Sequence, residues 1–443
     1  MRKQQNKPKE KGFLKDKYEK IMGDSLYRNS IYLMISSGVM AVFGFFFWLI
    51  CARLFPAEQI GLATTIISLM GLVASFSVLG LGTGLIRYLP NSKDKNKMIN
   101  TSFTVVALTA IIISCIILIG IEKFSPRLIF IKENIIFSFA FIFFMILQSL
   151  NSMIESVFIA FRKAKFVLVK NTVFSVLKLG MPFIFIAFGA FGIFSSYMSA
   201  SLIGFGVVFL ILIFKFHYNP KFVFYDSVIL KMGKYSFGNY VAGFIGGLPL
   251  MLLPLIITNI LHPETTAYYY MAMMIATLLF VIPGATNNSL FAEGSHDERG
   301  LKKNVIKSIW IITILLIPAI LITILFGGHI LLAFGKEYSA QGFNFLKLMA
   351  LSGILVSINS IFGSVFRIRK KILGILVASI ISAITILGLS YLFIHQGRGL
   401  IGIAYAYIIG QAVVALFYWI SYKKKGKDKY RKKKPAKSST TKL

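Results

Sequence analysis

Two neighbouring apolar stretches of the chain each carry a row of polar residues at helical spacing. The rows are Gln148, Asn151, Ser152 and Glu155 in the first stretch, and Asn171, Ser175 and Lys178 in the second. Spacings of three and four residues place each row on one face of a helix. Amide, hydroxyl and charged groups on such faces could line a polar cavity, in which a cation could hold an anionic group of a substrate.

Glu155 and Lys178 are the charged members of these rows, and charged residues inside apolar stretches are candidates for function. In one interpretation Lys178 lines the cavity. In a second, Lys178 pairs with Glu155, because their depths differ by less than the reach of a lysine. A third has the Lys178 ammonium reaching toward the headgroups. Cavity lining and pairing can hold together, so the residues leave both open.

Arg87 is a further candidate for the cavity. It follows the glycine-rich run Gly80-Leu81-Gly82-Thr83-Gly84. It either ends the second apolar stretch at the membrane surface or faces the mouth of the cavity.

The sequence shows no motif for nucleotide binding and no cluster of metal ligands. The nearest candidate for a phosphate-binding loop, Gly335-Lys336-Glu337, lacks the upstream glycine and the metal-binding hydroxyl. The five histidines are far apart in sequence, and the two cysteines, Cys51 and Cys115, lie inside apolar stretches. We therefore expect no catalytic residues, no metal, no cofactor and no enzyme activity.

The polar rows belong to twelve apolar stretches, each long enough to cross a hydrocarbon layer of about 30 Å as a helix. The second six repeat the first six at intervals of 205 to 209 residues, which indicates a duplication. Such a duplicated bundle is typical of transporters. The stretches are 30–52, 60–82, 99–121, 134–160, 167–189, 192–214, 236–260, 267–291, 304–326, 343–366, 372–394 and 400–421.

Basic residues are concentrated on one predicted side of the membrane. Of 48 Lys and Arg residues, nine lie in 1–28, eleven in 423–443 and eighteen in alternate loops, against six in the opposite loops. This pattern predicts a multi-pass protein of the cytoplasmic membrane with both termini in the cytoplasm. The net charge of +32 suits anionic membrane lipids as partners. Nucleic acid is not expected, because neither tail offers a basic face on a folded domain.

The predicted organisation has two helical lobes and no soluble domain. In the linker between the lobes, Phe222–Tyr225 could form a short amphipathic element at the membrane surface. The parts are a basic cytoplasmic tail (1–28), an N-terminal six-helix lobe (29–214), a cytoplasmic linker (215–235), a C-terminal six-helix lobe (236–422) and a second basic cytoplasmic tail (423–443).

Three short motifs resemble a known family. They are Leu54-Phe55-Pro56-Ala57-Glu58-Gln59-Ile60-Gly61, Leu79-Gly80-Leu81-Gly82 and Ile86-Arg87-Tyr88-Leu89. Together with the basic turns after the fourth and tenth spans, they resemble polysaccharide transporters, the O-antigen and teichoic-acid flippase branch of the multidrug/oligosaccharidyl-lipid/polysaccharide exporter superfamily. The resemblance covers residues 25–422.

The resemblance implies an all-α integral membrane protein of the MATE-like fold, with twelve transmembrane helices in two duplicated six-helix lobes around a central cavity. It implies a flippase that moves a polyprenyl-(pyro)phosphate-linked oligosaccharide across the cytoplasmic membrane, by alternating access and without ATP hydrolysis. Lys178 would suit the phosphate of that substrate. Glycan polymerase or ligase proteins are expected as further partners.

Two alternatives remain. A MATE-type cation-coupled multidrug exporter would favour acidic cavity residues, and Glu155 is the one clear acid inside a span. A membrane scaffold for cell-envelope assembly would need no polar interior.

Overall fold

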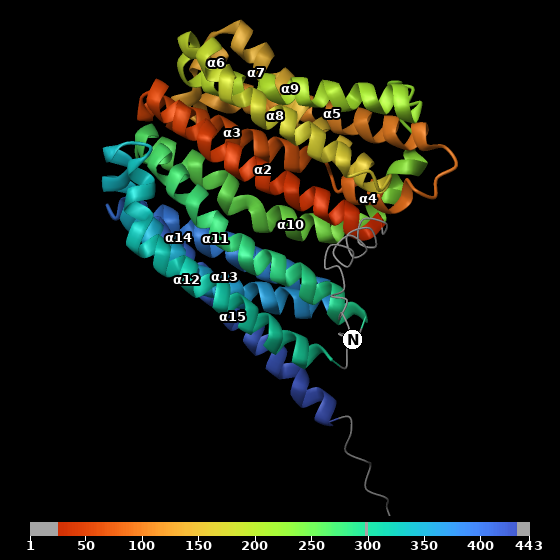
Figure 1. Cartoon of the computed structure of the whole chain (residues 1–443), viewed down its shortest axis with the longest axis vertical. Coiled ribbons are helices and arrows are strands. Elements are labelled where there is room, and N and C mark those ends of the chain that lie inside the picture. Colours follow the sequence, from red (N-terminus) through yellow and green to blue (C-terminus); the bar gives the residue numbers. More distant parts are fainter. Residues whose placement is uncertain (1–24, 297–299, 432–443) are drawn as a thin grey trace, which may run out of the picture. The chain divides into compact units, whose positions relative to one another are not determined.

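The described part of the chain consists of α-helices and short connections. The computed structural model describes residues 25–296 and 300–431 (Figure 1). Within them, twelve helices are long and apolar enough to cross a membrane, as the hydropathy pattern predicted. Most of each predicted basic tail lies outside the described residues.

The long helices follow one another with short connections. They are α2 (Ser25–Leu54), α3 (Ala57–Ser77), α5 (Lys95–Phe124), α7 (Ile135–Ala160), α8 (Lys165–Ile184), α9 (Gly189–Phe216), α10 (Asp226–Ile260), α11 (Pro263–His296), α12 (Leu301–Leu332), α13 (Lys336–Ile368), α14 (Ile372–His395) and α15 (Gly399–Arg431). The short elements are α4 (Leu81–Tyr88), α6 (Phe130–Glu133) and two 3-10 turns, η1 (Pro126–Leu128) and η2 (Ile186–Phe188).

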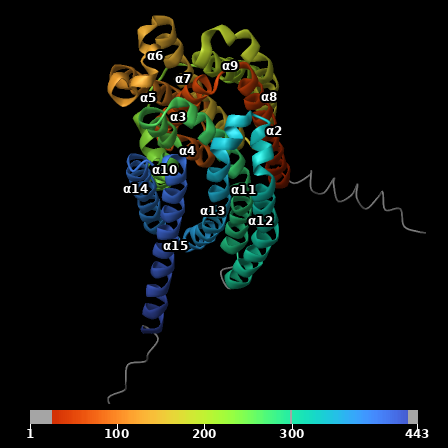
Figure 2. The same cartoon turned by 90° about the vertical axis from the view of Figure 1, so that its left-hand side faces the viewer.

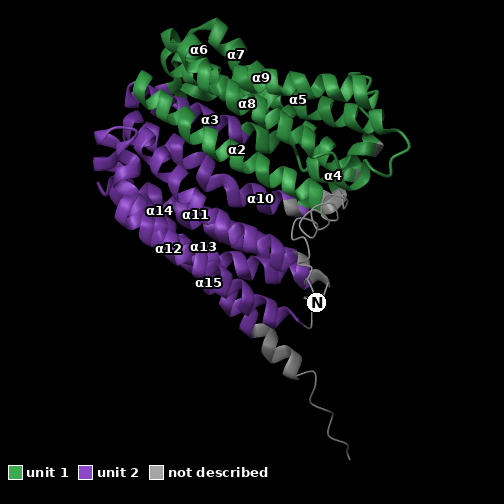
Figure 3. Ribbon diagram, viewed as in Figure 1, with its two compact units in different colours: residues 1–55, 73–124, 128–237 green, residues 56–72, 125–127, 238–443 purple. Residues whose placement is uncertain are grey.

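The chain divides into two compact units (Figure 3). The division cuts α3 after Leu72 and α10 after Phe237, so neither unit is one continuous segment of sequence. The lobe boundaries at residues 214 and 236 stay a prediction. Unit 1 comprises residues 1–55, 73–124 and 128–237, and unit 2 comprises residues 56–72, 125–127 and 238–443.

The second predicted span, 60–82, is longer than the helix that forms. The α3 helix ends at Ser77, and α4 begins after Leu79 and Gly80, whose φ angles are 48° and 76°. Two successive residues in the left-handed region interrupt an α-helix, and glycine adopts that region without a steric cost. Arg87 therefore lies at the end of the separate short helix α4 and not at the end of the span.

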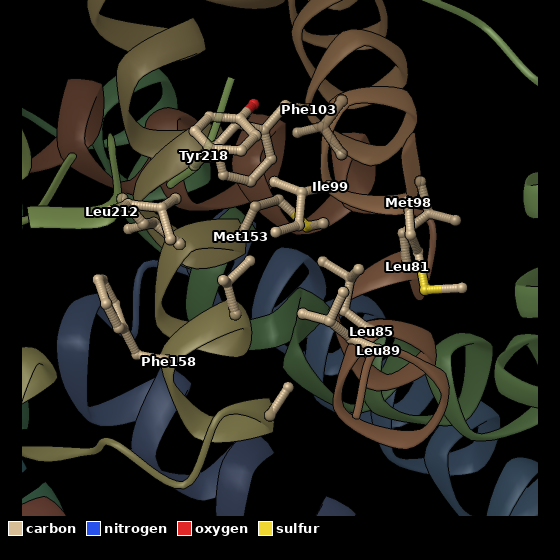
Figure 4. Packing of buried hydrophobic residues seen from close by; sticks show 14 of the residues in the cluster. Leu81, Leu85, Leu89, Met98, Ile99, Phe103, Met153, Phe158, Leu212 and Tyr218 are labelled. Carbon is tan, nitrogen blue, oxygen red and sulfur yellow. The ribbon is translucent and has the colours of Figure 1, made fainter. Parts of the chain in front are cut away.

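The buried core of unit 1 is formed around α4, α5, α7 and α9 (Figure 4). Leu85 and Leu89 of the α4 segment, Ile99 of α5 and Met153 of α7 are 0 to 1% exposed. A methyl group added at Gly84 would lie 2.8 Å from the Cβ atom of Met232 on α10, so α4 and α10 approach closely there. This packing fixes α7, which carries the first polar row.

The connection from α9 to α10 is held on the start of α5. The amide of Asn100 donates to the carbonyl of Asn219 over 2.9 Å, and its oxygen accepts from Tyr218 and from the Lys221 amide. Burial raises the pKa of Tyr218, so its hydroxyl stays protonated and keeps donating. The residues Phe222–Tyr225, for which an amphipathic element was predicted, form neither helix nor strand. The next helix, α10, begins directly after them at Asp226.

In unit 2, the first part of α3 packs against α10 and α11. The hydroxyl of Thr258 lies 2.5 Å from that of Thr65 and 2.7 Å from that of Thr266, and all three residues are fully buried. Each hydroxyl can donate one hydrogen bond and accept others. The three hydroxyls therefore serve as hydrogen-bond partners for one another, which the hydrocarbon of a membrane could not do. Residues of α3 that precede Val73 are thereby tied to unit 2.

Candidate functional site

Unit 1 contains a half-open polar cavity of about 340 Å³. Four helices of this unit, α2, α7, α8 and α9, supply its walls. Its volume lies within the range of roughly 300–1,000 Å³ that small-molecule sites occupy.

Three of the four walls repeat one spacing. Each of α2, α7 and α8 contributes residues i, i+3, i+4 and i+7, which is one helical face. The contributions are Leu33, Ser36, Ser37 and Met40 from α2; Gln148, Asn151, Ser152 and Glu155 from α7; Val167, Lys170, Asn171 and Phe174 from α8; and Tyr197 and Ser201 from α9. The whole predicted row on α7 therefore lies in the cavity wall.

An ion pair lies in the cavity wall. The Lys170 ammonium is 2.6 Å from a carboxylate oxygen of Glu155 and donates to the amide oxygen of Asn151 over 3.3 Å. The Lys170 side chain is 8% exposed, whereas that of Glu155 is 36% exposed. The pair leaves the cavity without a net charge from these two groups, and it presents one side of a carboxylate to the space.

The predicted alternative that Lys178 pairs with Glu155 is wrong. Glu155 lies five residues before the end of α7, and Lys170 lies five residues after the start of the following helix, so the two are level. Lys178 lies eight residues further along α8, which is about 12 Å deeper. Lys170 was not among the predicted residues, although it lies beside Asn171 and three residues after Val167, which repeats the spacing found on α7.

Amide and hydroxyl groups complete the polar lining. The Asn151 amide donates to the Ser201 hydroxyl over 2.8 Å, and the Asn171 amide donates to the Ser36 hydroxyl over 2.9 Å. Ser201 comes from α9 and Ser36 from α2, so the network ties the four helices together. Groups that donate and accept in this way can exchange partners with the hydroxyls of a sugar or with phosphate oxygens.

Lys178 and Ser175 lie deeper on α8 and do not line this cavity. Lys178 is 3% exposed, and its ammonium lies 4.7 Å from the ring centre of Phe174 and 5.9 Å from that of Phe47. No carboxylate among residues 25–296 and 300–431 lies within 4 Å of it. The Ser175 hydroxyl is buried without a hydrogen-bond partner in the described residues. Phe174, the ring under the Lys178 ammonium, does line the cavity.

Arg87 is exposed in the last turn of α4 and is not among the residues around the cavity. Its guanidinium lies 5.6 Å from the ring centre of Tyr88. Four of the seven predicted residues therefore line the cavity: Gln148, Asn151, Glu155 and Asn171. Within the described residues, no three His, Cys, Asp or Glu side chains gather closely enough to hold a metal ion.

Sequence comparison identifies relatives in cell-surface polysaccharide assembly. The family described as "Polysaccharide biosynthesis protein" matches residues 50–341. A protein of Shigella flexneri named "Putative O-antigen transporter" is 24% identical over 345 residues, which cover 74% of this chain and 81% of that protein.

Solved structures of two transporter types share the fold. The lipid II flippase MurJ, in an inward closed conformation, superposes with a TM-score of 0.74 at 15% identity, over 89% of this chain and 87% of its own. An inward-facing multidrug resistance transporter of the MATE family and MOP superfamily gives 0.70 at 15% identity, over 92% of this chain and 100% of its own. At such identity the likeness shows the MATE-like fold alone. The match over residues 50–341 spans more than half of the sequence, so this chain belongs to the polysaccharide biosynthesis protein family and is a multi-pass membrane protein.

Proposed function

We propose that this protein is a flippase for a polyprenyl-(pyro)phosphate-linked oligosaccharide, working by alternating access without ATP hydrolysis. The observation that carries the proposal is the lining of the cavity in unit 1. Amides of Gln148, Asn151 and Asn171, several hydroxyls and the Lys170–Glu155 pair meet there. These groups match the hydroxyls and the phosphate of a glycan headgroup, while the polyprenyl chain can remain in the bilayer.

A cation-coupled multidrug exporter fits this cavity less well. Such a protein needs an acidic group that is available to an organic cation. Glu155, the one acid among the residues that line the cavity, lies 2.6 Å from the ammonium of Lys170. An incoming cation would have to displace the Lys170 ammonium. That ammonium is buried, and no second carboxylate of the described residues lies within 4 Å to take the place of Glu155.

Deletion of the gene in its native cell separates the two functions. We expect lipid-linked oligosaccharide to accumulate on the cytoplasmic face of the membrane and the matching surface glycan to fall by about tenfold or more. Sensitivity to ethidium should stay within about twofold of the parent, because transport of cations is not the function. Radiolabelled lipid extracts, glycan immunoblots and growth inhibition by ethidium measure the three effects, and a plasmid copy of the gene should reverse the first two. Normal surface glycan with marked hypersensitivity to ethidium would make the protein a drug exporter.

Lys178 is proposed to serve the substrate through its charge. It is a buried cation over Phe174, with no carboxylate within reach in the described residues. The variant Lys178→Gln should lower surface glycan about tenfold at unchanged protein level, because an anionic headgroup loses a nearby cation. Lys347→Gln is the control, since Lys347 also lies near an aromatic ring, 4.0 Å from the ring centre of Phe343 on α13, and does not line the cavity. Wild-type glycan in Lys178→Gln would remove Lys178 from the mechanism.

The orientation of the chain is a proposal that rests on the alternation of basic loops. Two exposed residues, Glu133 of α6 and Lys93 before α5, lie on loops that should face opposite sides. In a background with Cys51→Ala and Cys115→Ala, a membrane-impermeant maleimide should label Glu133→Cys in intact cells. Lys93→Cys should react after permeabilisation only. Labelling of both in intact cells would contradict the span order.

A further inference from the structure

A second cavity of about 820 Å³ is an apolar groove on unit 2. Its walls are α12 and α15, and α13, which packs against both, forms its floor. Figure 2 shows α13 between the other two helices. Isoleucine, leucine and valine side chains supply most of the surface, and several of them are strongly exposed, such as Ile309 at 47% and Ile354 at 44%. The groove is thus open along its length to whatever surrounds unit 2.

The length of the groove along its helices equals the thickness of one membrane leaflet. Along α12 it extends from Lys302 to Ile317, and along α13 from Arg369 to Ile354. Each interval is fifteen residues, or about 22 Å of helix. Half of a bilayer measures roughly 20–22 Å when its headgroups are included. An occupant that matches the groove therefore has the length of a lipid of one leaflet.

One end of the groove is basic. Lys302 lies in the first turn of α12, Arg369 follows the last residue of α13, and Lys423 lies in the second half of α15, eight residues before its end at Arg431. All three side chains are exposed, and no described acidic side chain lines the groove or lies within 4 Å of them.

Two aromatic rings lie beside the cations. The Arg369 guanidinium is 4.8 Å from the ring centre of Tyr422, and the Lys423 ammonium is 3.9 Å from that of Trp419. Both rings line the groove. Tyr and Trp are enriched where a membrane helix crosses the headgroup level, so the basic end of the groove lies at that level and the apolar part below it.

We propose that the groove binds one anionic diacyl phospholipid. Its phosphate is held by Lys302, Arg369 and Lys423, and its acyl chains lie along the isoleucine-rich floor. The length of the groove favours this lipid over a polyprenyl phosphate, whose longer chain would extend past Ile317 and Ile354. The groove shares no lining residue with the polar cavity of unit 1, and the proposal would stand if the proposed substrate were wrong.

Tryptophan fluorescence tests the proposal, because Trp419 lines the groove and Trp310 does not. Trp310 is 65% exposed on the same unit and samples lipid in general. The full chain with Trp48→Phe and Trp310→Phe is reconstituted with phosphatidylcholine and phosphatidylglycerol, either of which is brominated in its acyl chains. Brominated phosphatidylglycerol should quench Trp419 with a relative affinity about fivefold or more above brominated phosphatidylcholine. With Trp48→Phe and Trp419→Phe, Trp310 should show no preference beyond about twofold.

A matched pair of triple variants identifies the residues. Lys302→Gln, Arg369→Gln and Lys423→Gln together should abolish the preference at Trp419. Lys303→Gln, Lys307→Gln and Arg367→Gln remove the same charge from exposed neighbours outside the groove and should leave it. Circular dichroism checks that both variants keep their helices.

Three results would overturn the proposal. Equal quenching of Trp419 by the two lipids would mean that the groove does not select a charge. Equal loss in both triple variants would mean a general basic surface in place of a site. Displacement of brominated phosphatidylglycerol by polyprenyl monophosphate at a lower mole fraction than by unbrominated phosphatidylglycerol would assign the groove to an isoprenoid lipid.

Discussion

Glu155→Gln is expected to lower surface glycan by at least about tenfold and to destabilise the protein. The change leaves the Lys170 ammonium, whose side chain is 8% exposed, without its carboxylate partner. Breaking a buried ion pair by removing one member costs about 3–5 kcal/mol, and the lower end applies because the Glu155 side chain is 36% exposed. Complementation of the deletion strain measures glycan, and thermal unfolding of the purified protein measures stability.

The double variant Glu155→Gln, Lys170→Gln separates structure from function. It removes both charges, so most of the stability should return. If the pair serves the substrate, glycan should stay low even though the protein is stable. Glycan at the wild-type level in the double variant would show that the pair is structural alone.

An exposed ion pair of the same length is the control. Lys132 and Glu122 are also 2.6 Å apart, but their side chains are 43% and 57% exposed. Glu122→Gln should change neither glycan nor stability measurably, because solvent screens such a pair. An equal effect of Glu122→Gln and Glu155→Gln would mean that the position of Glu155 in the cavity does not matter.

The polar row on α7 was predictable because one helix carried all of it. Gln148, Asn151, Ser152 and Glu155 share a face in any α-helix, and the whole face lines the cavity. The wall on α8 was predicted in part only, since Asn171 lies in it whereas Ser175 and Lys178 do not.

Periodicity predicts which residues share a face of a helix. It does not predict which residues of that face lie level with which residues of the neighbouring helix. The level of α8 against α7 depends on the turn between them, and this level brings Lys170 to Glu155. Ser36 carried no sequence signal of its own, because one serine in an apolar helix is ordinary. Its role follows from the approach of α2 to α8, where it accepts from Asn171.

The fold was predictable to a similar extent. Hydropathy predicted the twelve spans. The sequence also repeats a short motif at corresponding helix starts: Leu54-Phe55-Pro56 comes before α3, and the similar Leu261-His262-Pro263 lies at the start of α11. The packing of the first part of α3 against α10 and α11 was not predictable, since the duplication places α3 with the first six helices. The position of this part of α3 depends on its contacts with α10 and α11. The close contact with α11 is possible because residue 61 is a glycine.

Gly61→Ala in α3 should destabilise the protein. A Cβ atom at Gly61 would lie 1.7 Å from the carbonyl oxygen of Pro263 and 2.4 Å from its carbonyl carbon. These are backbone atoms at the start of α11, so no side-chain rotation relieves the clash and the two helices must separate. Overpacking of this kind costs about 1–3 kcal/mol or more. The separation also strains the hydrogen bonds of Thr258 to Thr65 and Thr266.

Gly71→Ala is the matched change on the same helix. A Cβ atom there meets nothing within 4 Å, so the only effect is the gain of roughly 0.5–1 kcal/mol when alanine replaces glycine in a helix. Thermal unfolding in detergent should therefore shift in opposite directions, down by several degrees for Gly61→Ala and slightly up for Gly71→Ala. Equal midpoints for the two variants would contradict the close approach of α3 to α11, because alanine adds the same group to the same helix in both.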